Sequence, residues 1–415
     1  MTASLDLTLE LAVLLATGVV LLSVVVSPLA TRLGAPILLL FLGIGMLAGQ
    51  DGPGGYVLND FDLVYDLGSI ALAVILFAGG LGTRAADIRV CIGPALSMAT
   101  LGVMVTAGVV GLAGWLAGMP LFVALLLGAV VGSTDAAATF LLLQGRGIRL
   151  RARVMETIVV ESGLNDPMAI FLTLTLVTIV DAGGGVDSLS WALAGSFAQQ
   201  IGIGALAGVA GGLGLGLLVN RLRLAAGLYG VLALAAALAL FEATQLAGGS
   251  GYLAVYLCGV LTMQRVTDAH RQELDITHGS LAWLSQILMF LLLGLLVTPS
   301  DLGAEALHAA GVAAVLIFIA RPVAVAVCLA PFRYRLRERL FIAWVGLRGA
   351  VPIFLAIIPV LSPGPIDTDF FNVVFLVVIA SLVLQGWTIP WLARRLDLET
   401  PPTAGEPADA DPLRP

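Results

Sequence analysis

The segment VVESGLNDPMAIF, residues 159–171, places acidic and amide side chains in the middle of an apolar stretch of sequence. Its polar residues include Glu161, Asn165 and Asp166, and Pro167 follows them directly. A carboxylate in a hydrocarbon environment costs several kcal/mol unless it is paired, protonated or bound to a cation. The segment therefore predicts a site that holds a cation or a proton inside a membrane.

Helical spacing sorts these side chains onto faces. Ser162 and Asp166 are four residues apart and share one face of a helix. Pro167 has no backbone N–H, so the carbonyl of Gly163 loses its usual donor. We expect Ser162, Asp166 and this freed carbonyl to converge on one hard monovalent cation, such as Na⁺ or K⁺, because such ions prefer oxygen ligands.

Two arginines lie inside apolar stretches and need partners. A buried Arg pairs best with a carboxylate, which its planar fork can bind through two hydrogen bonds. We predict that Arg348 pairs with Glu161, and we assign Arg321 a structural or inner-gate role. Asp166 is then the only free carboxylate. Burial favours its neutral form, so it holds either one proton or one cation.

Two further apolar stretches carry polar residues near their middle: VVGSTDAAAT, residues 130–139, and VGLRGAVP, residues 345–352. Their Gly and Pro residues predict interrupted helices, which in transporters form the transport site near the bilayer midplane. Thr134 and Asp135 would then lie beside Asp166. Asp135 has two interpretations, as an ion ligand or as a cap for the broken helix ends.

The composition restricts the class of protein. The chain has 415 residues, of which 59% are hydrophobic and 11% charged, and soluble domains carry about 25% charged residues. The sequence therefore predicts an all-α, polytopic membrane protein. It contains no basic patch for nucleic acid, and its three cysteines lie in apolar stretches, where packing is their expected role. The N-terminus lacks a positively charged region, so we expect no cleaved signal peptide.

Stretches of about 20 apolar residues predict membrane spans. Thirteen are present, at residues 8-30, 35-49, 64-82, 90-117, 120-144, 152-180, 192-219, 224-246, 250-264, 275-298, 305-332, 337-360 and 370-393. The arginines of the connecting loops fall in alternate loops, which predicts an outside N-terminus and a cytoplasmic C-terminus. Residues 1–398 would form the transmembrane domain, and residues 399–415 a disordered cytoplasmic tail.

Internal similarity predicts two inverted six-helix repeats. The sequence GSIALAVILF at Gly68 resembles GSLAWLSQILMF, which begins 211 residues later at Gly279. The repeats would span about 8-180 and 224-396, with a linker helix at about 192-219. An inverted repeat is the architecture of many secondary transporters. The linker helix carries a glycine stripe, which permits close packing within the protomer or, less favoured, a dimer face. The stripe consists of Gly204, Gly208, Gly212 and Gly216.

The combination of ESGLNDP, STDAAAT and GLRGAVP resembles the NhaP-type branch of the monovalent cation/proton antiporters. ILFAGGL and SLVLQGWTIP are most similar to the bacterial potassium/proton antiporters of that branch. The resemblance implies thirteen helices, an inverted repeat, crossed discontinuous helices, a homodimer and electroneutral exchange.

The resemblance also implies roles for single residues. Asp166 would bind cation or proton, with Asn165 as its neutral partner. Ser162 and the Thr134 backbone are similar to the ion ligands of the family, and Glu161 with Arg348 to its structural ion pair. The chain departs from the family at Ala78, where relatives usually carry an acidic residue.

We therefore expect a secondary transporter of a bacterial inner membrane that exchanges K⁺ or Na⁺ for H⁺ in a 1:1 ratio. It would need no cofactor and would not be an enzyme. A passive cation channel remains the alternative, and uphill proton movement driven by a cation gradient distinguishes the two. An intramembrane hydrolase using Ser162 is disfavoured, because the sequence offers no His or Lys at midplane depth to act as a base.

Overall fold

The computed structural model describes residues 17–26, 36–83, 85–144, 146–183, 191–225 and 227–400. Within these ranges the regular structure is helical, and the only β-type pairing is an isolated bridge between Leu150 and Glu399. Residues 17–26, inside the first predicted span, are helical. Most of the predicted tail lies outside the described residues.

The remaining helices follow the apolar stretches of the sequence. They are α2 (Ile37–Ala48), α3 (Phe61–Gly82), α4 (Ala85–Ser97), η1 (Met98–Gly102), α5 (Val103–Leu116), α6 (Leu121–Val130), α7 (Ala136–Gln144), α8 (Ala152–Asp181), α9 (Trp191–Arg221), α10 (Leu228–Leu246), α11 (Gly251–Arg265), α12 (Asp268–Leu296), η3 (Pro299–Asp301), α13 (Leu302–Val315), η4 (Leu316–Ala320), α14 (Arg321–Cys328), α15 (Leu336–Trp344), α16 (Ala350–Leu355), α17 (Ile357–Leu361) and α18 (Thr368–Arg395).

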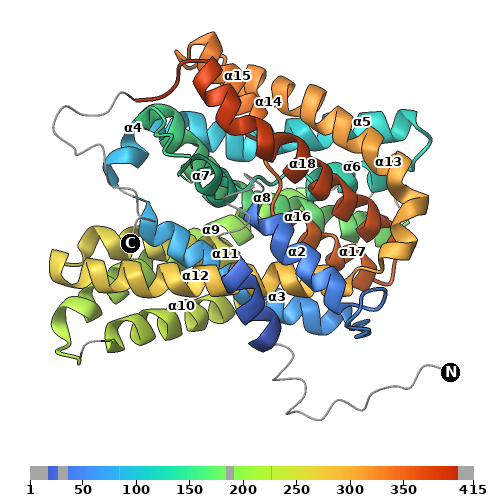
Figure 1. The fold of residues 1–415 in the computed structure, drawn as a ribbon. Helices are drawn as coiled ribbons and strands as arrows, with labels where there is room; N and C mark the ends of the chain where they lie inside the picture. The colour runs from blue at the N-terminus through green and yellow to red at the C-terminus, as the bar shows by residue number, and fades with distance from the viewer. Residues whose placement is uncertain are drawn as a thin grey trace.

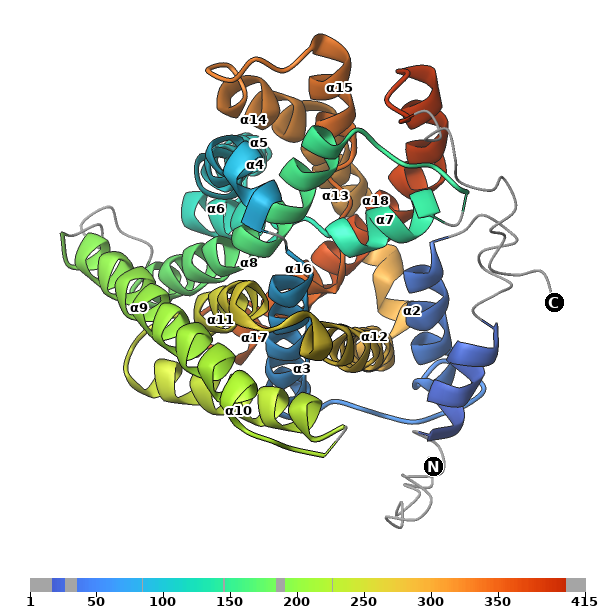
Figure 2. The same ribbon diagram turned by 90° about the vertical axis from the view of Figure 1, so that its left-hand side faces the viewer.

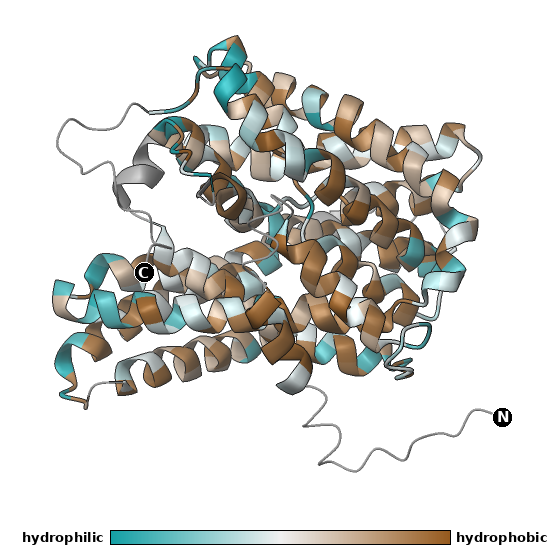
Figure 3. Cartoon of the chain, viewed as in Figure 1, coloured by the Kyte–Doolittle hydropathy of each residue, from teal (hydrophilic) through white to brown (hydrophobic). Residues whose placement is uncertain are grey.

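Helix length and composition confirm a multi-pass membrane protein. In the described part of the chain, eight helical segments are long and apolar enough to cross a membrane, and four shorter apolar helices accompany them. Apolar residues cover the middle of the helices, whereas hydrophilic residues gather at helix ends and loops (Figure 3). Exposed side chains such as Leu206, Phe318 and Trp391 are therefore suited to contact lipid.

Helix boundaries differ from the predicted ones where charged residues continue a helix beyond its apolar part. The predicted span 275-298 corresponds to α12, which begins at Asp268. Its first turns contain Asp268 and Arg271, which pair through a 3.0 Å contact. A hydropathy criterion locates only the apolar part of a helix, so it misses these polar turns.

Two predicted spans are broken, as the Gly- and Pro-containing motifs indicated. The span 120-144 divides into α6 and α7, which are separated by residues 131–135. The span 337-360 divides into α15 and the α16–α17 pair, with residues 345–349 between α15 and α16. In contrast, α8 continues through Pro167 without a break, because a membrane helix tolerates a single missing donor when its neighbours pack around it.

The helices form two groups that lie side by side (Figures 1 and 2). We call α2, α3 and α9 to α12 the helix panel, in which α11 packs on α9 and α3, and α12 on α3 and α2. The other helices from α4 to α18 form the helix bundle, in which α8 packs on α4 and α6, and α13 on α18. The short helices α16 and α17 contact both groups.

The glycine stripe of α9 packs inside the panel. A Cβ atom at each of its four glycines would collide with α11 or with the Ser250 cap that precedes it. At Gly208 the colliding atoms include the carbonyl oxygen of Ala254, and at Gly212 that of Cys258. The stripe therefore brings the two backbones together, which confirms the predicted packing within the protomer.

Candidate ion-binding site

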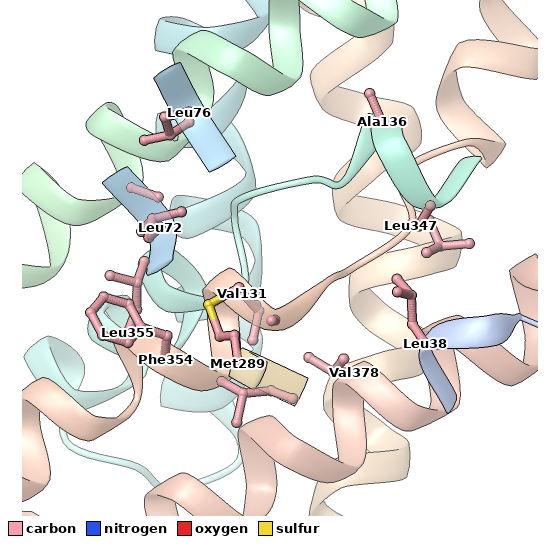
Figure 4. Packing of buried hydrophobic residues seen from close by; sticks show 14 of the residues in the cluster. Leu38, Leu72, Leu76, Val131, Ala136, Met289, Leu347, Phe354, Leu355 and Val378 are labelled. Carbon is pink, nitrogen blue, oxygen red and sulfur yellow. The ribbon is translucent and has the colours of Figure 1, made fainter. Parts of the chain in front are cut away.

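The two broken helices meet at their extended segments. The backbone N–H of Asp135 donates to the carbonyl oxygen of Leu347 over 2.8 Å. Gly349 lies so close to the Asp135 carboxylate that any Cβ atom there would collide with it. Figure 4 shows the non-helical stretch that leads to Ala136 and the one that contains Leu347. The breaks thus bring short polar side chains to the wall of the bundle that faces the panel.

Asp166 lies in the middle of α8 and is 6% exposed. Its Oδ1 accepts a 2.5 Å hydrogen bond from the hydroxyl of Ser133, which belongs to the first break. The described part of the chain gives Asp166 no ion pair. A buried carboxylate whose partner is a neutral hydroxyl retains its full charge when ionised, so it attracts either a proton or a cation.

The other predicted ligands gather around Thr134. The hydroxyl of Ser162 donates to the carbonyl oxygen of Thr134 over 2.8 Å and accepts from the N–H of Ala136 over 3.1 Å. The amide nitrogen of Asn165 donates to the hydroxyl of Thr134 over 2.7 Å. Asn165 is 1% exposed and its Oδ1 has no partner among the described residues. The structure therefore brings Ser162, Asn165, Thr134 and Asp166 together. Helical spacing had grouped only Ser162 with Asp166, whereas Thr134 was selected by its depth in its span and Asn165 by the resemblance.

Asp135 caps the second half of its broken helix. Its Oδ1 accepts a 3.0 Å hydrogen bond from the N–H of Ala138, in the first turn of α7. This is the capping interpretation of Asp135. The residue also lines the cavity that contains Asp166, so its negative charge, when ionised, also acts on an ion in that cavity.

The predicted ion pair between Glu161 and Arg348 is wrong. Glu161 instead forms two hydrogen bonds with Arg321 of α14, of 2.5 and 3.0 Å. Both side chains are almost completely buried, with 1% and 5% exposed. Arg321 is therefore the arginine of the buried ion pair, which fits the structural one of its two predicted roles, and its partner is the carboxylate that we had assigned to Arg348.

Arg348 satisfies backbone groups instead of a carboxylate. Its Nη1 donates to the carbonyl oxygens of Gly132 and Ser133, over 2.7 and 2.5 Å. Its own backbone N–H donates to the hydroxyl of Ser381 in α18. The break after α6 leaves carbonyls without helical donors, and Arg348 lies at the facing break, so the crossing of the two segments determines this pairing. Sequence spacing carries no information about that crossing.

A cavity of about 410 Å³ separates the panel from the bundle at this level. The bundle contributes polar residues to its wall: Ser133, Thr134, Asp135, Ser162 and Asp166. The panel contributes mainly small and apolar residues, including Ala78, with Tyr256, Trp283 and Gln286 as its side chains that carry a polar atom. The cavity extends along α3 from Leu72 to Gly82.

Sequence reasoning missed Ser133, Tyr256 and Gln286 at this site. Ser133 immediately precedes Thr134 in a motif that we had already selected, so its depth in the span was an available signal. Gln286 is a polar residue inside an apolar span, but a single amide side chain in a membrane helix has several ordinary explanations. Only the packing of α12, which places Gln286 at the cavity wall, distinguishes it from other polar residues in the membrane helices.

Comparisons with known proteins agree with this geometry. Residues 19–395 match the family model described as sodium/hydrogen exchanger, transmembrane. The chain is 46% identical over 398 residues to the K(+)/H(+) antiporter NhaP of Alkalimonas amylolytica, and 47% identical over 382 residues to the K(+)/H(+) antiporter NhaP2 of Shewanella oneidensis. These alignments cover 96% and 92% of this chain but 69% and 66% of the relatives, so the chain spans about two thirds of their length.

The fold also matches solved structures. The sodium proton antiporter MjNhaP1 from Methanocaldococcus jannaschii superimposes with a TM-score of 0.76 at 22% identity, over 92% of this chain and all of that chain. This similarity supports the fold alone. Together with the curated relatives, it confirms the resemblance to cation/proton antiporters drawn from the sequence motifs and the expectation that the chain is a transporter, not an enzyme.

Proposed function

Because the chain belongs to the sodium/hydrogen exchanger family, we propose that it exchanges K⁺ for H⁺ in a 1:1 ratio through alternate occupation of Asp166. The observation that carries this proposal is the contact between Asp166 and the neutral hydroxyl of Ser133, in a cavity shared with two broken helices. A proton and a cation then compete for the same carboxylate.

The choice of K⁺ follows from the similar proteins. Relatives at 46% and 47% identity bear the name K(+)/H(+) antiporter. The Na(+)/H(+) antiporter NhaH of Halobacillus aidingensis is 26% identical over 322 residues. The relatives with the higher identity are the better guide to the transported ion, so K⁺ is the first cation to test and Na⁺ the second.

The buried charges balance in a way that suits electroneutral exchange. Glu161 and Arg321 neutralise each other. Arg348 contributes one positive charge at the crossing, whereas Asp135 and Asp166 contribute two negative charges when ionised. The remaining charge is therefore one negative unit, which either one proton or one monovalent cation neutralises. Because both loaded forms carry the same charge, reorientation moves no net charge across the membrane.

The cation ligands follow from the same geometry. Asp166, which bonds to Ser133, supplies a carboxylate oxygen; Ser162 supplies a hydroxyl and Thr134 a carbonyl oxygen. All of them line the same cavity. These are oxygen ligands of the kind that hard cations prefer. Asn165 positions the Thr134 side chain and adds no charge, and Asp135 adds a nearby negative charge while it caps α7.

The proposal includes an architecture for the whole chain. It has thirteen spans, two inverted six-helix repeats at about 8-180 and 224-396, an outside N-terminus and a cytoplasmic C-terminus. It works as a homodimer in the bacterial inner membrane. The breaks after α6 and α15 support the repeats, since they fall in corresponding spans of the two halves.

Proteoliposomes with an internal pH dye and an imposed proton gradient test the function. Addition of K⁺ to wild type should collapse the gradient, and Asp166→Asn should abolish this response because the amide cannot take up and release the transported proton and has no negative charge to attract the cation. The control is Asp62→Asn, which removes a carboxylate from an exposed position of α3 and should retain exchange. Residual K⁺-dependent proton flux in Asp166→Asn would contradict the assignment.

The same vesicles separate an antiporter from a passive channel. An outward K⁺ gradient, with no initial proton gradient, should drive protons inward until the internal pH falls below the external pH. The membrane potential must be clamped at zero, because K⁺ efflux through a passive channel would make the interior negative and draw protons inward; under the clamp, only coupled exchange moves protons uphill. With the membrane potential clamped at zero, an internal pH that stays at the external value would favour a passive cation pathway.

A further inference from the structure

The two walls of the Asp166 cavity differ in chemistry. The oxygen-bearing residues of the bundle, from Ser133 to Asp135 with Ser162 and Asp166, all approach from one side. The facing wall is formed by α3, α11 and α12, and the α3 residues that line it, Ala78 among them, carry no charge. A cation held by the bundle alone would therefore have ligands over only part of its surface.

A larger cation makes this asymmetry more costly. K⁺ is held in proteins by oxygens that surround it and replace its hydration shell. It stands further from a given carboxylate than a smaller ion does, and so extends further toward the panel. A ligand on the panel wall thus contributes more to K⁺ than to Na⁺, provided that it is a neutral oxygen that can reach into the cavity.

Three panel residues with polar atoms line the cavity, and two of them are unsuitable. The indole of Trp283 is a donor only and cannot bind a cation through nitrogen. The ring of Tyr256 packs directly over Gly163, where a Cβ atom would collide with it, so its hydroxyl is held against α8. Gln286 remains, and its amide has a carbonyl oxygen with two lone pairs.

Gln286 is buried, with 9% of its surface exposed, and belongs to the face of α12 that lines the cavity. Ala282 and Met289 lie on the same face, one turn away in either direction. Its neighbours along this face are apolar, so the amide is the polar group that α12 presents there beside Trp283. A buried amide in a membrane helix is costly in free energy unless its polar atoms find partners.

We infer that the amide oxygen of Gln286 is the panel ligand of the transported cation, and that it favours K⁺ over Na⁺. This inference rests on the proposed function, because it names a further ligand of the same site. The amide is neutral, so it supplies an oxygen ligand from the uncharged panel wall without adding a charge. The count of one proton exchanged for one cation is therefore retained.

The test compares apparent KM values for K⁺ and Na⁺ in proteoliposomes at fixed pH. Gln286→Leu removes the oxygen and keeps the volume similar. It should raise the KM for K⁺ about tenfold, the equivalent of one hydrogen bond to a charged group, and change the KM for Na⁺ less. Gln286→Asn keeps the oxygen on a shorter side chain and should recover part of the K⁺ affinity. Maximal exchange rates should stay similar to wild type.

The control is Leu288→Ala, on a more exposed face of the same helix, which should leave both KM values unchanged. A KM for K⁺ that is unaltered in Gln286→Leu, while Asp166→Asn is inactive, would overturn the role of Gln286 and leave the proposed function standing. Equal increases for K⁺ and Na⁺ would refute the selectivity. Absence of exchange in wild type would reject the proposed function itself.

A Gln286→Leu protein that fails to fold is recognised by its thermal melting in detergent, and the comparison is then made with Gln286→Asn.

Discussion

At the scale of single residues, the pairing of Glu161 with Arg321 shows what residue type alone cannot determine. Arg321 and Arg348 both lie in predicted spans, and by its chemistry either guanidinium could pair with the Glu161 carboxylate. Arg321 has a planar fork that meets both carboxylate oxygens of Glu161, whereas Arg348 donates to two carbonyl oxygens. Carbonyls freed by a broken helix also accept hydrogen bonds from a guanidinium, so residue type alone does not determine which arginine pairs with the carboxylate.

This geometry leads to a stability prediction for Arg321. Replacing it with Met leaves Glu161 as an unpaired buried carboxylate, and we expect a loss of about 3–5 kcal/mol in the free energy of unfolding. The double variant Glu161→Gln, Arg321→Met should lose less than the sum of the two single variants. Thermal melting in detergent measures all four proteins. Additive losses would show that the contact contributes no coupling energy.

At the scale of elements, the two broken helices support each other. The segment after α15 is held by α18: Gln385 donates to the Trp344 carbonyl oxygen over 2.6 Å, and Ser381 accepts from the Arg348 N–H over 3.1 Å. The segment after α6 is held by Ser162 and by Arg348. Backbone groups of each break are therefore satisfied by side chains from a neighbouring helix or from the other break, as a membrane interior requires.

The contact between Gly349 and Asp135, which joins the two breaks, is open to a direct test. In Gly349→Ala the new Cβ atom would occupy the position of the Asp135 carboxylate, so the breaks must move apart. We expect at least about a tenfold loss of exchange rate, since displacement of positioned groups by about 1 Å already costs this much or more. Dye-based exchange assays in proteoliposomes provide the measurement.

The matched control is Gly108→Ala in α5, where a Cβ atom would meet open space. This variant should exchange like wild type and melt at the same temperature or slightly higher, since Ala favours a helix more than Gly does. Full activity in Gly349→Ala would mean that the contact between Gly349 and Asp135 has no role in positioning the site.

At the scale of the whole molecule, the site lies between the panel and the bundle rather than inside either. All the charged residues of the cavity wall, Asp135 and Asp166, belong to the bundle. The panel wall is neutral. The net charge moved in one transport cycle is therefore determined by the charged residues of the bundle and by the proton or cation that they bind.

We predict that exchange is independent of membrane potential. The proton-loaded and cation-loaded forms have the same net charge, so an electric field does no net work on their reorientation. Solid-supported membrane electrophysiology should detect no sustained charge movement when a K⁺ or a proton gradient is applied to wild-type vesicles. A steady current that reverses with the direction of the gradient would refute the one-carboxylate scheme.

The sequence alone determined that the chain is an all-helical membrane protein with a polar site near the middle of its spans. A membrane interior requires long apolar segments and makes every polar group inside them costly in free energy. Both the spanning helices and the polar residues inside them can therefore be recognised from the sequence. Ser162, Asn165 and Asp166 are near one another along a single helix, and their short spacing sufficed to group them.

The tertiary structure decided which polar groups meet across helices. Four contacts join segments that are distant in sequence. They are the pairing of Glu161 with Arg321, the hydrogen bonds from Arg348 to backbone carbonyls, the hydrogen bond from Ser133 to Asp166, and the packing of Gln286 at the cavity wall. These contacts depend on how the broken helices cross and how the panel faces the bundle. A pattern of apolar and polar residues determines which face of a helix is buried, but the neighbour that covers this face follows only from the packing of the complete chain.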